Sequence, residues 1–175
     1  MRRKCKVCKA PAKYVTCDNK AHCGNPECVL ELHQQMREKR ITQKIKERKE
    51  RLRNTVPYWT KKAQAEFNKY IRNRDQHLPC VSCGREITLK RNAGHYRTVG
   101  ANPELRFCEL NVHMQCEACN NFKSGNLVEY RIELARRIGA TQLEWLEGPH
   151  EPKHYRVEDL KEIYQKYKAL NNEYR

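Results

Sequence analysis

Apolar residues recur with helical spacing in the middle of the chain. Between residues 57 and 77 they fall at intervals of three and four, which places them on one face of an α-helix. The positions are Trp59, Ala63, Phe67, Tyr70 and Ile71. We expect this stripe to form core for the domain that follows, while basic residues elsewhere on the helix remain available to phosphate.

The C-terminal region repeats this kind of pattern three times. A helix is predicted over residues 127–138, and Gly139 follows at a position where glycine commonly ends helices. A short helix around residues 142–147 stops at Gly148 and Pro149. The final helix carries its apolar residues on one face: Val157, Leu160, Ile163, Tyr164, Tyr167 and Leu170. All three are predicted to be packing elements.

A different helix is predicted near the N-terminus. Residues 27–54 contain no Gly or Pro and are rich in Glu, Lys, Arg and Gln, all good helix formers. Their apolar positions are too sparse for a coiled-coil seam. We therefore expect an exposed basic helix that ends before Pro57. It either lies on nucleic acid or separates two modules, and the pattern favours neither.

Composition changes this picture by limiting the core. Of the 175 residues, 38% are apolar and 33% charged, so a core is small and needs added stabilisation. No apolar run is long enough for a transmembrane helix, and the basic start MRRKCKVCKA lacks the apolar stretch of a secretory signal. We expect the ten cysteines to be reduced, so that closely spaced pairs are metal ligands.

The basic residues are unevenly distributed. Residues 1–56 carry 16 basic and 6 acidic side chains, and residues 57–126 carry 11 and 6. Residues 127–175 are balanced, with 9 of each. A polyanionic partner explains this asymmetry, and nucleic acid is the favoured one.

Two Cys-x-x-Cys pairs mark the centre of the chain. Thirty-two residues separate Cys83 from Cys116, enough for a β-hairpin between two zinc knuckles. Four thiolates form a closed tetrahedral zinc site, which is structural rather than catalytic. The expected ligands are Cys80, Cys83, Cys116 and Cys119.

A second zinc knuckle is predicted at the N-terminus. Five cysteines compete there for four places, and His22 and His33 lie close by. Pro26 indicates a helix start that places one cysteine on its first turn. The preferred ligands are Cys5, Cys8, Cys23 and Cys28. Cys17, like Cys108, is interpreted as a small buried thiol.

Polar residues between and after the central pairs follow the spacing of the HNH (ββα-metal) nuclease motif. His95 comes first, then a segment with strand character at Leu105–Phe107, then Asn111 and Asn120. In that motif the middle Asn precedes the final ligand by nine positions and the first knuckle Cys by five, as here. A Lys three residues after the final ligand also recurs, matching Lys123.

The resemblance extends over nearly the whole chain. The stretches WTKKAQ, RDQHLPCVSCG, AGHYRT, LRF and CNNFKSGNLVEYRIELARRIG resemble the NinG (Rap) recombination proteins of lambdoid phages. An N-terminal cysteine cluster followed by a basic helix also fits that family. The resemblance implies a structure-specific endonuclease that cleaves branched DNA, such as D-loops and Holliday junctions, in phage recombination. It also implies a location in the cytoplasm of the bacterial host.

Each residue of the motif has an expected role. His95 is the general base, Asn111 orients it, and Asn120 coordinates a catalytic Mg²⁺ or Mn²⁺. Lys123, Arg97 and Arg106 are expected to contact DNA phosphates. Many HNH sites carry an acidic metal ligand directly before the base, where this chain has Gly94. The cation is then bound weakly, or another residue, such as Asn92 or His113, supplies a ligand. The other interpretation of His113 is that it is structural.

These features predict an α+β, mostly helical protein with a small zinc-braced ββα (HNH-type) core. We expect a zinc knuckle over residues 1–30, a basic helical linker over 31–56 and a nuclease domain over 57–175. A homodimer is attractive, since symmetric cutting of a four-way junction needs two active sites.

Three other functions remain open. A non-catalytic, zinc-braced DNA-binding accessory protein would account equally for the charge and the cysteines. An RNA-binding zinc protein would account for the basic arm, but the chain shows no aromatic stacking motif. A sequence-specific homing or restriction enzyme would need a base-reading module, which the sequence does not reveal.

Overall fold

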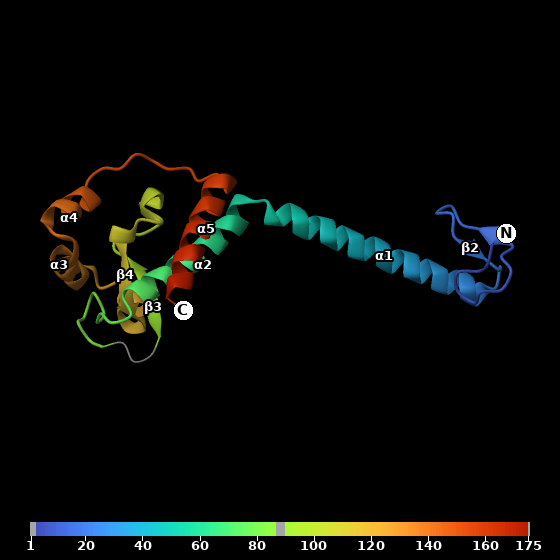
Figure 1. The fold of residues 1–175 in the computed structure, drawn as a ribbon, viewed down its shortest axis with the longest axis horizontal. Helices are drawn as coiled ribbons and strands as arrows, with labels where there is room; N and C mark the ends of the chain where they lie inside the picture. The colour runs from blue at the N-terminus through green and yellow to red at the C-terminus, as the bar shows by residue number, and fades with distance from the viewer. Residues whose placement is uncertain (1–2, 87–89, 175) are drawn as a thin grey trace. The chain divides into compact units, whose positions relative to one another are not determined.

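The computed structural model describes residues 3–86 and 90–174 (Figure 1). The chain divides into two compact units, Met1–Arg53 and Asn54–Arg175, each with its own contacts. Within the described ranges, no helix is both long and apolar enough to cross a membrane. The mostly helical α+β class predicted from the sequence is confirmed.

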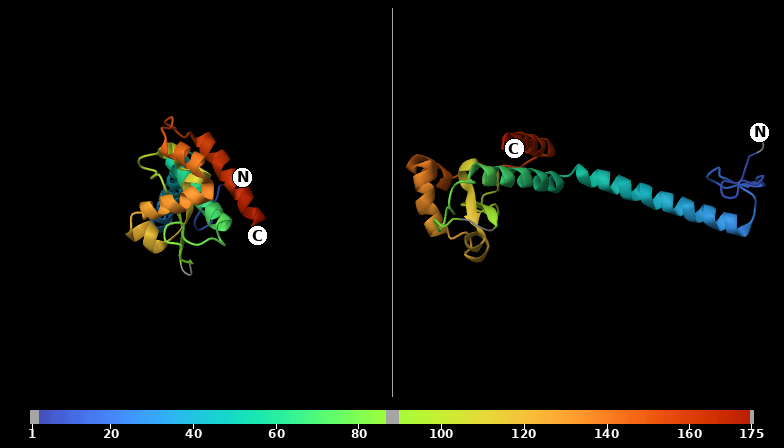
Figure 2. Two further views of the ribbon diagram at one scale, coloured as in Figure 1. Left: turned by 90° about the vertical axis from the view of Figure 1, so that its left-hand side faces the viewer. Right: turned by 60° about the horizontal axis from the view of Figure 1, so that its bottom comes forward.

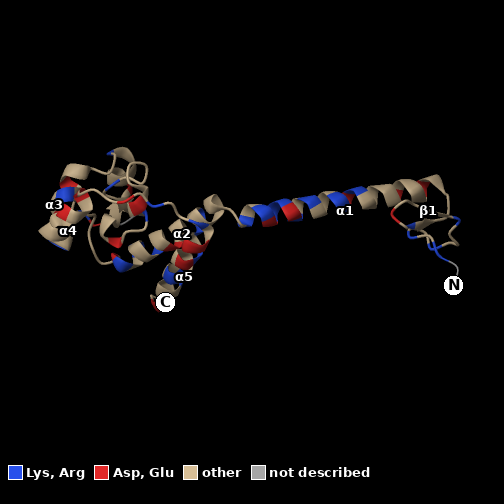
Figure 3. Cartoon of the chain, turned by 90° about the horizontal axis from the view of Figure 1, so that it is seen from above, with Lys and Arg blue, Asp and Glu red and all other residues tan. Residues whose placement is uncertain are grey.

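The first unit combines a two-stranded antiparallel sheet with one long helix. Strands β1 (Tyr14–Val15) and β2 (Ala21–His22) pair, and α1 (Pro26–Arg53) follows. The side chain of Asn25 accepts a hydrogen bond from the Glu27 amide at 2.8 Å, which helps to begin the helix. Only its first turns are buried, and Lys and Arg are spread along the rest (Figure 3). The predicted basic helix is therefore confirmed.

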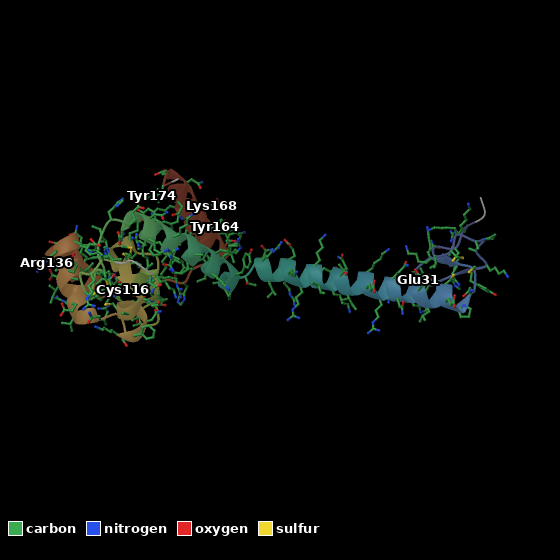
Figure 4. The ribbon with its side chains drawn as sticks, turned by 90° about the horizontal axis from the view of Figure 1, so that it is seen from below. Glu31, Cys116, Arg136, Tyr164, Lys168 and Tyr174 are labelled. Carbon is green, nitrogen blue, oxygen red and sulfur yellow. The ribbon has the colours of Figure 1, made fainter. Side chains whose placement is uncertain are left out.

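Helices α2 (Val56–Arg74) and α5 (Val157–Glu173) lie side by side in the second unit (Figure 2). The apolar stripe predicted for α2 is buried against α5, where the Phe67 and Tyr167 rings are 4.8 Å apart. Tyr164 and Lys168 project from α5 in Figure 4, and the Tyr164 ring meets the indole of Trp59 on α2. These contacts confirm both helices as packing elements.

An antiparallel hairpin forms the centre of this unit. Strand β3 (Arg91–His95) pairs with β4 (Val112–Cys116), so that His95 lies opposite Val112 and Gly94 opposite His113. Three short helical turns accompany the hairpin: η1 (Pro103–Leu105), η2 (Glu109–Asn111) and the π-helical η3 (Ala118–Phe122).

The strand character predicted at Leu105–Phe107 is wrong. Leu105 ends the 3-10 turn η1, and the Arg106 amide donates to the Pro103 carbonyl at 3.2 Å. Local hydrogen bonds of this kind replace strand pairing, because Pro103 fixes a helical φ at the start of the turn. The apolar side chains that suggested a strand pack inward from the turn, with Leu105 only 3% exposed.

Helices α3 (Leu127–Ile138) and α4 (Ala140–Glu147) form the remaining side of the unit. They share a buried cluster with the hairpin region, made up of Val81, Leu105, Tyr130, Leu134, Leu143 and Leu146. Gly139 separates the two helices with a positive φ of 82°, a conformation that favours glycine. The predicted helix end is therefore confirmed.

One buried carboxylate links α2 to the hairpin. Asp75, just after α2, is 2% exposed. It accepts hydrogen bonds from the Met114 amide at 3.0 Å and from Arg74 Nε at 2.7 Å, and it lies 3.6 Å from His113 Nδ1. Burial opposes ionisation, but the hydrogen bonds from His113 and Arg74 outweigh it, so the pKa of Asp75 is well below its usual range.

Candidate metal centres and the polar site beside the hairpin

The central cysteines gather as predicted. The sulfur atoms of Cys80, Cys83, Cys116 and Cys119 all lie within 4.8 Å of one another. Cys83 Sγ and Cys116 Sγ are 3.9 Å apart, close to the ~3.8 Å that a tetrahedral zinc site with Zn–S bonds of about 2.3 Å requires. Figure 4 shows Cys116 within the second unit. These four thiols could hold a zinc ion and leave it no open position.

The local fold of the first knuckle explains this arrangement. The Gly84 amide donates to the Cys80 carbonyl at 2.9 Å, and Gly84 has a positive φ of 66°. The Cys116 amide, from the other knuckle, donates to Cys80 Sγ at 3.3 Å. Burial opposes ionisation of Cys80, but hydrogen bonds from the backbone of Cys116, Cys83 and Ser82 lower its thiol pKa overall. Burial raises the pKa of Cys83 and Cys119 in the same cluster, so Cys80 is the thiol that ionises more readily before a metal binds.

The N-terminal cluster is also confirmed as a possible metal site. Cys5, Cys8, Cys23 and Cys28 bring their sulfur atoms within 4.8 Å of one another. Cys28 lies in the first turn of α1, where the proline-led helix start was expected to place it. A hydrogen bond from the Cys8 backbone, chief among several N–H contacts, lowers the pKa of Cys5 to about 6.

The two remaining cysteines differ from each other. Cys108 is half-buried and packs against the central apolar cluster, consistent with a structural thiol. Cys17 is exposed, so the expectation of a buried thiol is wrong there. It lies in the turn between β1 and β2.

His95 is held in a defined orientation at the end of β3. Its Nε2 lies 3.0 Å from the Arg106 carbonyl. A carbonyl only accepts, so Nε2 carries the proton and Nδ1 retains a lone pair. Burial disfavours the charged imidazolium and lowers the pKa of His95 below its ordinary value of 6.5. The neutral side chain can therefore accept a proton at neutral pH.

Asn111 fastens the loop that holds His95. Its side chain is fully buried and accepts from the Arg97 amide at 2.7 Å. The same side chain donates to the carbonyls of Arg97 and Leu105, at 3.0 and 3.2 Å. Leu105 precedes Arg106, so Asn111 fixes the carbonyl that orients the imidazole. These contacts support the positioning role expected for it, which stays a prediction.

Asn120 approaches β3 from η3. A Cβ atom on residue 94 would lie 3.0 Å from Asn120 Oδ1, so this oxygen contacts the strand next to His95. Asn120 is half-exposed, and its amide nitrogen donates to Asn121 Oδ1 at 2.7 Å. The structure therefore brings His95, Asn111 and Asn120 to the same end of the hairpin.

The other residues considered for metal binding behave differently. His113 is buried, with Nδ1 3.2 Å from Arg74 Nη2 and Nε2 3.3 Å from the Leu110 carbonyl. It therefore belongs to the Asp75 network, as its structural interpretation required. Asn92 is half-buried, and its Nδ2 is buried without a hydrogen-bond partner among the described residues.

The three residues expected to contact phosphate differ in their surroundings. Lys123 is exposed just after η3, next to the candidate site. Arg97 bonds instead to Asn102 Oδ1 and to the Glu147 carbonyl, at 3.0 and 3.3 Å. Arg106 donates to Gln64 Oε1 at 3.2 Å. Both arginines make intramolecular contacts that a DNA phosphate would have to replace or share.

Sequence reasoning missed Gln115, which is fully buried between the hairpin and η3. Its Nε2 donates to Ser82 Oγ and to the Gly125 carbonyl. Its Oε1 occupies the space over Gly94, 1.8 Å from where a Cβ of residue 94 would lie. Gly94 itself was the available signal, since a strand glycine often marks the close approach of another group.

Comparison with known proteins places this chain in a family. A family model described as bacteriophage lambda NinG protein matches residues 1–175. Protein ninG of Escherichia phage lambda is 48% identical over 119 residues, 66% of this chain and 58% of that protein. Protein ninG of Escherichia phage 933W is 49% identical over 110 residues, 63% of this chain and 55% of that protein.

Protein ninG of Salmonella phage P22 is 47% identical over 110 residues, 63% of this chain and 54% of that protein. These matches span little more than half the length of the curated relatives, and no solved structure matches the chain. Because the family model covers every residue, the chain belongs to the NinG family of lambdoid phages.

Proposed function

We propose that this protein is a metal-dependent endonuclease that cleaves branched DNA, such as D-loops and Holliday junctions, during phage recombination. The observation that carries the proposal is the fixed orientation of His95. Its Nε2 bonds to the Arg106 carbonyl, in a loop that the Asn111 side chain holds. Asn120 lies against the same strand. The order of β3, β4 and η3 supports an HNH-type ββα centre, although η3 is a five-residue turn rather than a full helix.

Phosphodiester hydrolysis needs an attacking water, a base and stabilisation of the leaving oxygen. His95 accepts the proton of the water at Nδ1, while its Nε2–H remains bonded to the Arg106 carbonyl. Asn120 offers an amide oxygen to a hydrated Mg²⁺ or Mn²⁺, whose charge would stabilise the leaving oxygen. Lys123, exposed just after η3, is a candidate for a phosphate contact.

The charge distribution supports DNA as the substrate. The excess of basic residues lies before residue 127, and α1 exposes most of its Lys and Arg to solvent (Figure 3). Phosphate contacts position a protein on DNA without reading its sequence, which suits a nuclease that selects structure. The family membership favours a recombination role, since the residues resemble NinG (Rap) recombination proteins.

The second candidate is a zinc-stabilised DNA-binding accessory protein that does not cut. Gly94 favours it, because many HNH sites have an acidic metal ligand at this position. Such a protein would need the charge and the two cysteine clusters, but not an oriented base. The clamped His95 is therefore the observation that favours the nuclease over it.

A cleavage assay on linear duplex, D-loop and four-way-junction DNA of equal length tests the proposal. Wild type, His95→Ala and the matched control His154→Ala, an exposed histidine, would each be assayed with EDTA, Mg²⁺ or Mn²⁺. We expect metal-dependent cutting of branched DNA by wild type and by the control only. Full cleavage by His95→Ala would refute the active site, and tight binding without cutting under every metal would favour the accessory protein.

A further inference from the structure

Aromatic rings from two helices meet on one surface of the second unit. Tyr58 and Trp59 lie in the first turn of α2, and Tyr164 lies on α5. The centre of the Trp59 ring is 5.6 Å from that of Tyr58 and 5.7 Å from that of Tyr164, and both contacts are edge to face. All three side chains are half-buried, so each keeps part of its ring in solvent.

Two lysines reach from one helix to the rings of the other. Lys62 Nζ, from α2, is 6.0 Å from the centre of the Tyr58 ring and 5.6 Å from that of Tyr164. Lys161 Nζ, from α5, is 5.5 Å from the Trp59 ring. An ammonium group is attracted to the face of an aromatic ring, so cations and rings of the two helices are interleaved.

A third lysine completes this surface. Lys168 is exposed, one turn after Tyr164, and its Nζ lies 5.5 Å from the centre of the Tyr164 ring. Figure 4 shows both side chains projecting from α5. We call the six residues together the aromatic–lysine surface: Tyr58, Trp59, Lys62, Lys161, Tyr164 and Lys168.

No carboxylate neutralises the three lysines of this surface. Among the described residues, the ion pairs that α5 makes use Asp159 and Lys166. Glu158 and Glu162 are exposed on the same helix, but they pair with none of the three lysines. Neighbouring ammonium groups repel one another, so an anion placed among them lowers the electrostatic energy. The surface therefore favours an anionic ligand.

The rings decide which anionic ligand fits. An acidic peptide would pair with the lysines but would offer the rings no flat partner. A DNA duplex would offer phosphates, but its bases are already stacked on one another. A single strand offers both groups, because its phosphates meet the cations and its unstacked bases lie on aromatic side chains.

We propose that the aromatic–lysine surface binds single-stranded DNA, with bases stacked on its rings and phosphates held by its lysines. The choice of DNA over RNA rests on the recombination role, but binding here requires neither His95 nor a catalytic cation. The sequence shows no aromatic stacking motif, because the rings come from helices far apart in the chain. Among the proposed substrates, a D-loop presents a single strand and a fully paired four-way junction does not.

Tryptophan fluorescence reports on this surface directly. The chain has two tryptophans, so Trp145→Phe leaves Trp59 as the only one. This form of the zinc-loaded full chain would be titrated with an oligothymidine of about ten nucleotides. No Mg²⁺ or Mn²⁺ would be added, so that nothing is cut. Because α1 contains no tryptophan, binding there does not give the signal.

The comparison ligands and variants separate charge from stacking. An abasic strand, a duplex and an oligouridine, all of the same length, are the comparison ligands. Lys62→Gln combined with Lys168→Gln removes two exposed cations, and Tyr58→Leu removes one ring. Lys153→Gln is the matched control, since Lys153 Nζ lies 5.0 Å from the Tyr155 ring outside this surface. Melting temperature and zinc content check the folding of each variant.

We expect oligothymidine to quench Trp59 fluorescence to saturation, and the abasic strand and the duplex to bind more weakly. The double lysine variant should lower the slope of log affinity against log salt by about 1.4. Tyr58→Leu should weaken binding by about tenfold, and Lys153→Gln should bind as its parent does.

Several results would overturn the inference. They are an absent Trp59 response to oligothymidine, equal binding of the abasic strand or the duplex, and unchanged affinity and salt slope in the folded lysine and Tyr58 variants. Tighter binding of oligouridine than of oligothymidine would assign the surface to RNA instead.

The same titration separates this inference from the proposed function. If oligothymidine quenches Trp59 but no DNA is cut under any metal, the single-strand surface stands and the nuclease does not. If branched DNA is cut in a His95-dependent way while Trp59 gives no response, the nuclease stands and this surface is refuted.

Discussion

His95 shows how a single backbone carbonyl determines the chemistry of a side chain. The Arg106 carbonyl fixes both the ring orientation and the tautomer, and burial keeps the ring neutral. Asn111 does not touch the ring, but it holds the loop that carries Arg106. The contacts therefore differ for the proposed base, His95, and its proposed positioning residue, Asn111.

The pKa of His95 gives a test at this scale. Burial lowers it below 6.5, so the neutral, proton-accepting form predominates at neutral pH. The cleavage rate should stay level from pH 7 to 8 and fall as the pH drops through a value below 6.5. A pH–rate profile at saturating Mg²⁺ measures this. A rate that instead rises as the pH drops would mean that His95 is not the base.

At the scale of elements, neighbouring segments are joined by a few specific groups rather than by a large core. The cysteine cluster joins the residue 80–83 knuckle to the end of β4, and Asp75 joins α2 to the same strand. The hairpin that carries His95 therefore depends on both connections.

Removing one zinc ligand should break the first connection. Cys116→Ser takes a thiolate from the central cluster, so we expect loss of one zinc and unfolding of the residue 54–175 unit. Zinc content and melting temperature measure this, and Cys17→Ser, which alters an exposed thiol outside both clusters, should change neither. If Cys116→Ser kept its zinc and its melting temperature, the ligand assignment would be wrong.

Asp75→Asn should break the second connection. The variant loses the charge that pairs with Arg74 and His113, at a cost of about 3 kcal/mol in the free energy of unfolding. The folded pKa is lowered, so this stabilisation is fully present above the unfolded value of about 3.9 and is lost as the pH falls through the folded pKa.

Urea unfolding of zinc-loaded wild type and Asp75→Asn checks both statements. The difference in the free energy of unfolding should persist from pH 8 to pH 5, because the folded and unfolded pKa values of Asp75 both lie below pH 5. Its disappearance between pH 8 and pH 5 would contradict the assignment of this charge to the Asp75 network.

At the scale of the whole molecule, the larger part of the basic excess and the candidate active site lie in different units. The first unit carries a four-cysteine cluster that could hold zinc and an exposed basic helix, whereas the candidate active site lies entirely in the second. Under the proposed function, the first unit would contribute affinity for DNA and the second would contribute cleavage.

Lysines on α1 test that division. Lys44, Lys46 and Lys49 are exposed, so changing all three to Gln should weaken DNA binding without altering the fold. If all three contact phosphate, the slope of log affinity against log salt should fall by about 2.7. Glu38→Gln and Glu47→Gln on the same helix are controls that remove negative charges instead of positive ones, and they should not weaken binding. An unchanged salt slope would exclude α1 from the DNA interface.

The sequence by itself determined the features that depend on local spacing. The five predicted helices, the end of α3 at Gly139 and both four-cysteine sets follow from periodicity and from short-range ligand spacing. The family was also evident from contiguous motifs, and the family model confirms it. The nuclease activity and the roles of His95, Asn111 and Asn120 remain predictions.

Only the tertiary structure decided which groups meet across the hairpin. It replaced the expected strand at Leu105–Phe107 with a turn, because Pro103 and local hydrogen bonds govern that segment. It also placed Gln115 over Gly94 and gave Asp75 its partners in β4. Strand register and the packing of η3 determine these contacts, and both arise from residues distant in sequence, which periodicity does not reveal.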